Sequence, residues 1–348
     1  MTRQVHIRLQ QESILRKHRR SKAKAKARRR CKKRQAYDQP KEPRYGAPYR
    51  KPIKIASLAN DFRILENADT VIKDLNMILT CRGKNKKITK LHIDMTNVTN
   101  FDLGSLTCLL STLRFTENYQ GNEPKDPSCK EYFETSGFLT WMRDISGRKF
   151  IATNGNNLIF EKVVDKTSNA KVGQEIRKAI KYLTEKENPF PPVYSIIQEI
   201  CPNSIEHANT KKSDINWLMG IRYEKNKVCF AMCDKGQGIL KTIRKSRRQI
   251  IGDAFSDDMS ILQRAFDKKY QSATEDENRN KGLPRIKSVC DYGFVDNLTV
   301  ITNKTLLNLS DNSKSQSLGS EFAGTFYYWE ITKDNYDKWE KNKKSISA

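Results

Sequence analysis

Apolar residues in the first half of the chain recur at helical spacing in three places and alternate as in a strand in a fourth. In the first of these segments, Val71, Leu75 and Leu79 lie four positions apart and so share one face of a helix. In the second, Asp102 stands near the start, where an aspartate can accept hydrogen bonds from the free N–H groups of the first turn. The pattern predicts helices over residues 68–79, 101–113 and 131–141 and a strand over 88–94.

The second half of the chain, from residue 171 onward, combines helices with strands. Residues 223–226 separate two apolar runs with a short polar stretch and indicate a β-hairpin. This arrangement is typical of an α+β fold, in which helices pack against a mixed or antiparallel sheet. The predicted helices cover 171–184, 191–208, 260–267 and 282–292, and the predicted strands cover 215–222, 227–233, 297–302 and 324–331, with a polar loop up to residue 320 between the last two.

The length of the chain and the distribution of its charge indicate how many parts it has. Its 348 residues suffice for two domains, and its net charge of +25 is concentrated near the N-terminus. Residues 1–35 contain 15 Lys and Arg and one acidic residue, Glu12, and so carry +14. Because such a run attracts polyanions, we expect residues 1–36 to bind nucleic acid or a ribonucleoprotein partner without reading its sequence. A solvated tail and a tail that docks on an acidic protein are the alternatives.

The spacing of the cysteines and the hydropathy of the chain indicate in which cellular compartment the protein acts. The eight cysteines form no Cys-x-x-Cys pair, and none of the four histidines has zinc-ligand spacing to such a pair. No apolar run approaches the roughly 18 residues that span a bilayer, and the basic N-terminus lacks the apolar segment of a signal peptide. We therefore expect a cytoplasmic protein with reduced cysteines and no membrane partner.

Three segments of the second half carry candidate chemistry. The first lies in the predicted helix 191–208, where Glu199, Asn203 and His207 are spaced four apart and line one stripe. A carboxamide oxygen is a hard ligand that suits Mg²⁺, and a carboxylate can orient or deprotonate a water or hydroxyl. These residue types fit a phosphate site, although an amphipathic helix with a solvated polar stripe would look the same. Pro202 removes a hydrogen bond from this helix and favours a kink.

The second segment follows the predicted strand 227–233. It begins with Asp234 and continues through two glycines, Gly236 and Gly238, to Ile239. A buried aspartate at a strand end can accept a hydrogen bond from an adenine amino group, and glycines let the backbone pass close to the ring. A strand that runs into a glycine turn is the alternative.

The third segment opens the predicted helix 282–292 with Lys281, Gly282 and Leu283. Pro284 in the first turn fits a helix start. The N-terminus of a helix presents free N–H groups and the positive end of the helix dipole, and both suit phosphates.

In this order the three segments resemble the N box, the G1 box (Asp-x-Gly-x-Gly) and the G2 box of GHKL ATPases. That group has the Bergerat nucleotide-binding fold and contains gyrase, histidine kinases and mismatch-repair ATPases. The later Gly324-Thr325 resembles its Gly-Thr element. The resemblance covers residues 190–330, and the short lid, residues 240–281, with the Lys-Gly-Leu-Pro form is most similar to anti-sigma-factor-type ATPases.

The resemblance implies ATP and Mg²⁺ as cofactors and a role for each quoted residue. Glu199 would be the catalytic or water-positioning acid, and Asn203 would bind Mg²⁺. Asp234 would bind adenine, and Thr325 would touch Asp234 or its water. The residues implied to contact the nucleotide and its metal are Asn203, His207, Asp234, Gly236, Gly238, Ile239, Lys281, Gly282, Leu283 and Thr325.

Residues 91–106 resemble part of a STAS-like domain of anti-sigma-factor antagonists, in which one strand ends at an aspartate and a second aspartate opens a helix. Asp94 and Asp102 occupy these positions. The phosphoacceptor of that family directly follows the second aspartate, where this chain has Leu103. Ser105 is a nearby substitute, roughly 200° further round the helix. A plain strand–helix unit without a switch is the alternative.

Together these patterns predict the organisation and the function. We expect a basic arm and linker over 1–52, a STAS-like α/β domain over 53–165, a Bergerat-fold sandwich with helices on one face of a mixed sheet over 166–335, and a polar tail over 336–348. The expected function is an ATP-binding regulator with a protein partner, compatible with a homodimer, that acts as an ATPase, a Ser/Thr protein kinase or a binding switch. The alternative is a nucleic-acid-binding interaction protein, or an immunity or stress effector, with a non-hydrolysing ATPase-like fold.

Overall fold

A computed structural model describes residues 53–80, 90–114, 119–144, 146–150, 158–160, 167–206, 217–246, 257–267 and 282–347. The chain divides into two compact units, Met1–Arg50 and Lys51–Ala348, and all of the described residues belong to the second. The predicted basic arm therefore lies outside the described residues. Within the described ranges, no helix is long and apolar enough to cross a membrane.

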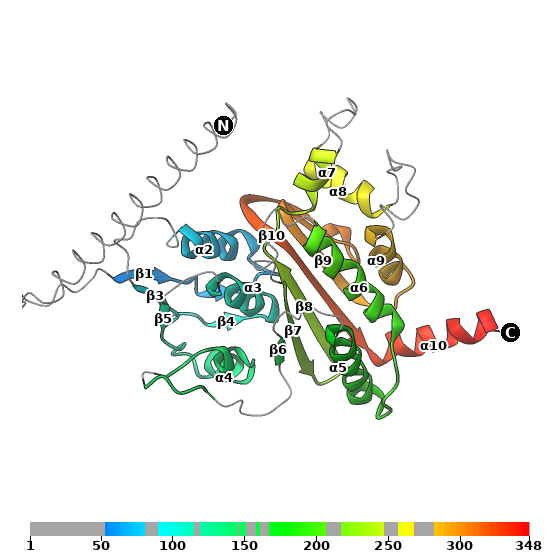
Figure 1. The fold of residues 1–348 in the computed structure, drawn as a ribbon, viewed down its shortest axis with the longest axis horizontal. Helices are drawn as coiled ribbons and strands as arrows, with labels where there is room; N and C mark the ends of the chain where they lie inside the picture. The colour runs from blue at the N-terminus through cyan, green and yellow to red at the C-terminus, as the bar shows by residue number, and fades with distance from the viewer. Residues whose placement is uncertain are drawn as a thin grey trace, which may run out of the picture. The chain divides into compact units, whose positions relative to one another are not determined.

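The first half of this unit contains two small parallel sheets, β1-β3-β5 and β2-β4, and the helices that connect their strands (Figure 1). Its elements are β1 (Ile53–Ser57), β2 (Asp61–Phe62), α2 (Ala68–Thr80), β3 (Lys90–Asp94), β4 (Asn100–Phe101), α3 (Leu103–Leu113), β5 (Tyr119–Gly121), α4 (Pro127–Thr135) and η1 (Phe138–Trp141). β1 and β5 each pair in parallel with β3, and β2 pairs in parallel with β4. Parallel neighbours require crossover connections, which α2 and α3 supply.

The second half is built on a five-stranded sheet with the strand order β6-β7-β8-β10-β9. Its elements are β6 (Leu158–Phe160), α5 (Thr167–Thr184), α6 (Pro191–Glu206), β7 (Trp217–Glu224), β8 (Lys227–Asp234), α7 (Ile239–Ser246), α8 (Asp258–Phe266), α9 (Gly282–Asp291), β9 (Asp296–Asn308), η4 (Asn312–Lys314), β10 (Gln316–Thr332) and α10 (Lys333–Ser347). Every described pairing in this sheet is antiparallel. Of the predicted mixed or antiparallel sheet, the described strands therefore form the antiparallel type, and hairpins join β7 to β8 and β9 to β10. Helices combined with both parallel and antiparallel sheets confirm the α+β class at that coarse level.

Both faces of the five-stranded sheet are covered. Along β8, Val228, Phe230 and Met232 point to one face and pack with α5, α6, α8 and α9. Cys229 and Ala231 alternate with them and point to the other face, which packs with α2 and α3. Figure 1 shows these two sets of helices on opposite sides of the sheet.

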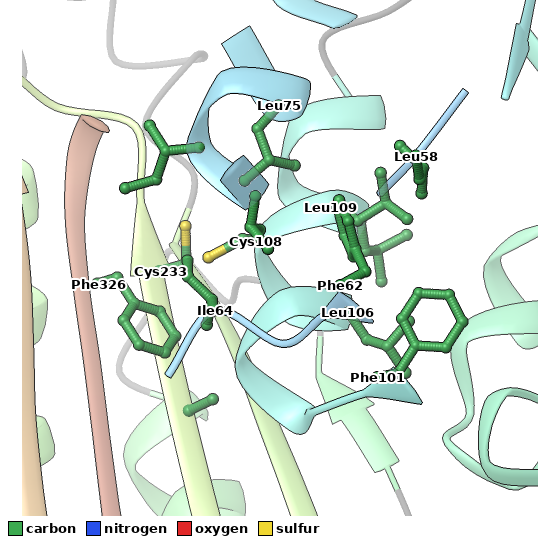
Figure 2. Close-up of a cluster of buried hydrophobic side chains, with 14 of the residues drawn as sticks. Leu58, Phe62, Ile64, Leu75, Phe101, Leu106, Cys108, Leu109, Cys233 and Phe326 are labelled. Carbon is green, nitrogen blue, oxygen red and sulfur yellow. The ribbon is translucent and has the colours of Figure 1, made fainter. Parts of the chain in front are cut away.

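The core between α3 and the sheet is continuous across the two halves of the unit (Figure 2). It joins Leu106 and Leu109 of α3 to Phe326 of β10, and it brings Cys108 of α3 next to Cys233 of β8. Both cysteines are buried free thiols. Strand β6 precedes residue 165 and yet pairs with β7 of the large sheet. The position of a domain boundary near residue 165 stays a prediction.

Two local predictions need correction, and the structure adds detail to a third. Residues 131–141 do not form one helix: α4 begins earlier, at Pro127 after the cap Asp126, and Gly137, with a φ of 78°, separates it from η1. The predicted polar loop between residues 302 and 320 is mostly strand, because β9 runs to Asn308 and β10 starts at Gln316. The predicted polar tail is helical in α10, where Tyr336 packs against Phe190 with ring centroids 5.7 Å apart.

Candidate functional site

Asp234 is the last residue of β8, a strand with neighbours on both sides, and only 9% of it is exposed. Its register partner on β10 is Thr325. The Oδ1 atom of Asp234 accepts hydrogen bonds from the backbone N–H groups of Gly236, at 2.8 Å, and of Thr325, at 3.0 Å. This carboxylate therefore joins the Asp-x-Gly-x-Gly turn to the Gly-Thr segment, 91 residues away in the sequence.

Two glycines of this region stand where a side chain would not fit. Gly238 has a φ of +84°, and a Cβ there would lie 2.5 Å from Oδ1 of Asn303. Gly324 has a φ of +122°, and a Cβ there would overlap the backbone oxygen of Asp234. Only glycine adopts such backbone angles without strain. The sequence pattern around Asp234 therefore has a steric cause in the folded chain.

Two consecutive residues of β9, Thr302 and Asn303, form hydrogen bonds with the backbone of the turn after Asp234. The Oγ1 atom of Thr302 accepts a hydrogen bond of 2.8 Å from the backbone N–H of Ile239. The Nδ2 atom of Asn303 donates one of 3.1 Å to the carbonyl oxygen of Gln237. Thr302 and Asn303 are both buried. Sequence reasoning missed them, and the only signal would have been a polar pair at the end of the predicted strand 297–302.

Helix α6 carries Glu199 and packs against α9. The Oε1 atom of Glu199 lies 2.7 Å from Nη1 of Arg285, in the first turns of α9, with 22% and 62% of the two side chains exposed. Sequence reasoning also missed Arg285, since nothing in its spacing relates it to a residue 86 positions earlier. The structure thus places the predicted acid beside the helix that opens with Gly282 and Leu283.

Three further predicted site residues, Asn203, His207 and Lys281, lie wholly or partly outside the described residues. The backbone of Asn203 lies one turn after Glu199 in α6, which stays helical past Pro202 to Glu206, but its side chain is outside the description. His207 and Lys281 also lie outside it. Whether these three side chains meet phosphate or Mg²⁺ stays a prediction. Among the described residues, no group of three or more His, Cys, Asp or Glu side chains could hold a metal ion.

The predicted lid over residues 240–281 needs revision in its middle. Helix α8 places Ile261, Leu262 and Phe266 in the main core of the sheet, each at most 1% exposed. A helix with this burial is part of the scaffold and not of a lid. The rest of 240–281 keeps that assignment as a prediction: α7 up to Ser246 is described, while the stretches 247–256 and 268–281 lie outside the described residues.

In the first half, the predicted strand and helix ends are confirmed as local structure. β3 ends at Asp94, and Asp102 caps α3. The backbone N–H of Ser105 donates to Oδ1 of Asp102, while Oγ of Ser105 accepts from the backbone N–H of Asp102 at 3.2 Å. Ser105 is fully buried in this reciprocal cap. Its hydroxyl is therefore not accessible as a substitute phosphoacceptor.

No protein-family model matches the chain, and a search of the curated proteins gives no match. The functional assignment therefore depends on the geometry around Asp234 and on the chemistry of the residues that surround it.

Proposed function

We propose that the second half of the chain, residues 166–335, binds Mg-ATP in the manner of GHKL ATPases. One observation carries the proposal: the Asp234 carboxylate gathers the backbone of Gly236 and of Thr325 around one buried strand end. A carboxylate held there can accept a hydrogen bond from the exocyclic amino group of adenine, and its neighbouring glycines leave the backbone close to the ring.

The phosphates would extend from this point toward the facing ends of α6 and α9. The N-terminal turn of α9, with Gly282 and Leu283 and with Lys281 before it, offers N–H groups to anionic oxygens. Asn203 would supply a ligand to Mg²⁺, and His207, which follows the last residue of α6 in the sequence, would lie near it. Glu199 would orient an attacking water or hydroxyl once its interaction with Arg285 is exchanged for one with the substrate.

The proposed role is regulation. ATP binding would change the surface that the chain presents to a protein partner, because the bound and free states differ in their contacts to the γ-phosphate. Hydrolysis, phosphorylation of a Ser or Thr of the partner, and a binding switch are all compatible with the position of Glu199.

Titration of Mg-ATP by calorimetry tests the proposal. Asp234→Asn keeps an oxygen that can accept the bonds from Gly236 and Thr325, so we expect it to fold while losing the charge-assisted bond to adenine. That loss corresponds to roughly 1.5–3 kcal/mol, or about 10–150-fold in affinity.

A second variant tests the metal ligand: Asn203→Ala should weaken the dependence of binding on Mg²⁺ specifically. As a matched control, Asp126→Asn changes a remote N-cap of α4 and should leave the affinity unaltered. A folded wild-type protein that shows no binding at millimolar ATP would refute the proposal.

A second proposal concerns the basic arm. We propose that residues 1–36 bind nucleic acid through their charge, since this stretch holds most of the net charge of the chain. In gel shifts against DNA and RNA, we expect deletion of 1–36 to lower affinity and to flatten its dependence on salt. Equal affinity of the deleted and complete chains across the salt series would exclude the arm as the binding element.

A further inference from the structure

Glu321 lies in β10 at a point where the strand touches helix α2 of the first half. The Nδ2 atom of Asn76 in α2 donates a hydrogen bond of 2.8 Å to the carbonyl oxygen of Glu321. The adjacent Ser320 donates its backbone N–H to Oδ1 of Asp69, at the start of α2, at 2.9 Å. Helix α2 therefore holds the backbone of residues 320 and 321 at two points.

The side chain of Glu321 contacts residues at the turn that follows Asp234. Its Oε1 atom accepts a hydrogen bond of 3.3 Å from Nδ2 of Asn303, the same nitrogen that donates to the carbonyl oxygen of Gln237. Its carboxylate also forms an ion pair with Lys241 in the first turn of α7. Glu321 is thus linked to both ends of the stretch from Gln237 to Lys241: to Gln237 through Asn303, and to Lys241 directly.

The β-ladder leaves this part of β10 weakly fixed. Between Ser317 and Thr325, the pairing with β9 shifts register twice and retains only Phe322 as a partner residue. The pairing with β8 starts only at Thr325. Because the ladder is irregular here, the contacts with α2 help to fix the position of Glu321, together with the burial of Leu318 and Phe322 in the core.

We propose that Glu321 is a positioning residue through which helix α2 sets the geometry of the nucleotide-binding turn, so that the first half of the chain controls the affinity of the second for ATP. The proposal rests on the proposed function. The contact that matters is the one with Asn303, which is buried and has a φ of 52°. The ion pair with Lys241 is solvated, with about half of each side chain exposed, and contributes little.

The turn has a second connection to the first half, and it allows the route through Glu321 to be isolated. The Nζ atom of Lys235 donates a hydrogen bond of 2.9 Å to Oγ1 of Thr112 near the end of α3. This contact does not involve α2 or Glu321. Removal of the Glu321 side chain therefore removes the side-chain route from α2 to the turn, while the backbone pairing of Phe322 with Asn303 and the contact with α3 stay in place.

A double-mutant cycle on the complete chain tests the proposal. Asn76→Ala removes the side-chain contact of α2, and we expect it to weaken Mg-ATP binding about 3- to 10-fold, as for one hydrogen bond. In the Glu321→Ala background the same change should alter affinity by less than about 2-fold, since the two act along one route. Glu321→Gln keeps an oxygen for Asn303 and should retain nearly full affinity. Asn100→Ala, which removes an exposed amide of the same half, is the matched control.

A second measurement separates failure of the coupling from failure of ATP binding. Without nucleotide, amide hydrogen exchange of residues 235–241 should be faster in Asn76→Ala than in the wild type or in Asn100→Ala. The N–H of Ile239, which is bonded to Thr302, is the most direct reporter. Faster exchange in a protein that binds no ATP supports the coupling and removes the proposed function. Unchanged exchange, or additive losses of affinity in the cycle, overturns the coupling even if ATP binds.

Discussion

Two aspartates of the first half, Asp94 and Asp102, have pKa values displaced in opposite directions. The side chains of Thr96 and Asn122 donate hydrogen bonds to Asp94 and lower its pKa to about 2. Asp102 also accepts hydrogen bonds, from the backbone N–H groups of Leu65 and Ser105, but desolvation by burial outweighs them and raises its pKa to about 6. The same residue type therefore has opposite effects on stability as the pH changes.

We predict that Asp102 makes the protein less stable as the pH rises from about 4 to about 6. The pKa in the folded state lies above the unfolded value of 3.8, so in this window the folded state binds a proton that the unfolded state has released; the free energy of unfolding therefore falls as the pH rises, until both states are ionised above about pH 6. The shift corresponds to at most about 3 kcal/mol, and we expect less because part of the residue is exposed. Asp102→Asn removes the titration and keeps an oxygen for the cap.

Urea unfolding between pH 4 and pH 7 at constant ionic strength measures this effect. The free energy of unfolding of the wild type, relative to Asp102→Asn, should be greatest near pH 4 and decline toward pH 7. Asp126→Asn is the control, because hydrogen bonds from Ser128 and Cys129 lower the pKa of Asp126 and move its titration below this window. Parallel curves for the wild type and Asp102→Asn would show that the carboxyl group is not desolvated as described.

At the scale of single residues, the sequence indicates those whose role depends on their immediate neighbours. Asp234 and Gly238 stand out as an aspartate at a strand end and a glycine four positions later, and the backbone angle explains the glycine. Gly324, far away in the sequence, is indicated only by its resemblance to the Gly-Thr element. Asn303 and Glu321 could not be predicted. Their contacts with the turn depend on the irregular register of β9 and β10, which no pattern of residue types reveals.

At the scale of elements, α3 approaches the five-stranded sheet closely because of glycines on both surfaces. A Cβ on Gly104 of α3 would lie 2.7 Å from both Cγ2 of Ile64 and Cζ of Phe326, and a Cβ on Gly220 of β7 would lie 2.6 Å from Oγ1 of Thr107. Ile64 and Phe326 are fully buried and cannot yield easily. The fit of this helix on the sheet therefore depends on small residues at the contact.

Two glycine-to-alanine changes in helices should have opposite signs. We predict that Gly104→Ala destabilises the protein by about 1–3 kcal/mol, since overpacking outweighs the gain in helix propensity. Gly173 of α5 is the matched control: a Cβ there would meet nothing closer than 3.8 Å. Gly173→Ala should stabilise the protein by about 0.5–1 kcal/mol. Thermal and urea unfolding check both values, and a stabilising Gly104→Ala would mean that α3 lies further from the sheet.

Elements with a clear periodicity are predictable, and the exceptions have physical causes. The hairpin of β7 and β8 follows from two apolar runs around a polar turn and is confirmed. The sequence predicts β9 too short, because Thr305 and Asn308 are polar and yet buried in the sheet, and it misses the start of β10, where most residues are exposed or half-buried. A polar residue that the tertiary structure buries carries no sign of that burial in the local sequence.

At the scale of the whole unit, helices pack against both faces of the five-stranded sheet. The apolar side chains that α2 and α3 cover include Ala231 and Cys233 of β8 and Phe326 of β10. Without the first half, these side chains would form one contiguous apolar surface. The two halves therefore depend on each other for stability, and such a shared core favours unfolding in a single cooperative transition.

We predict that a fragment of residues 151–348, which retains β6 and the whole large sheet, does not fold as a monomer on its own. Its uncovered face should cause aggregation or association, and co-expression with residues 51–150 should restore a soluble heterodimer, because the two pieces bury the same core as the intact unit. Size-exclusion chromatography and urea unfolding of the fragment, the pair and the complete chain measure this. A monomeric fragment that unfolds cooperatively at the midpoint of the complete chain would show that the second half is stable alone. In that case α2 would act on the nucleotide-binding turn only through contacts such as those of Glu321, and not through the integrity of the sheet.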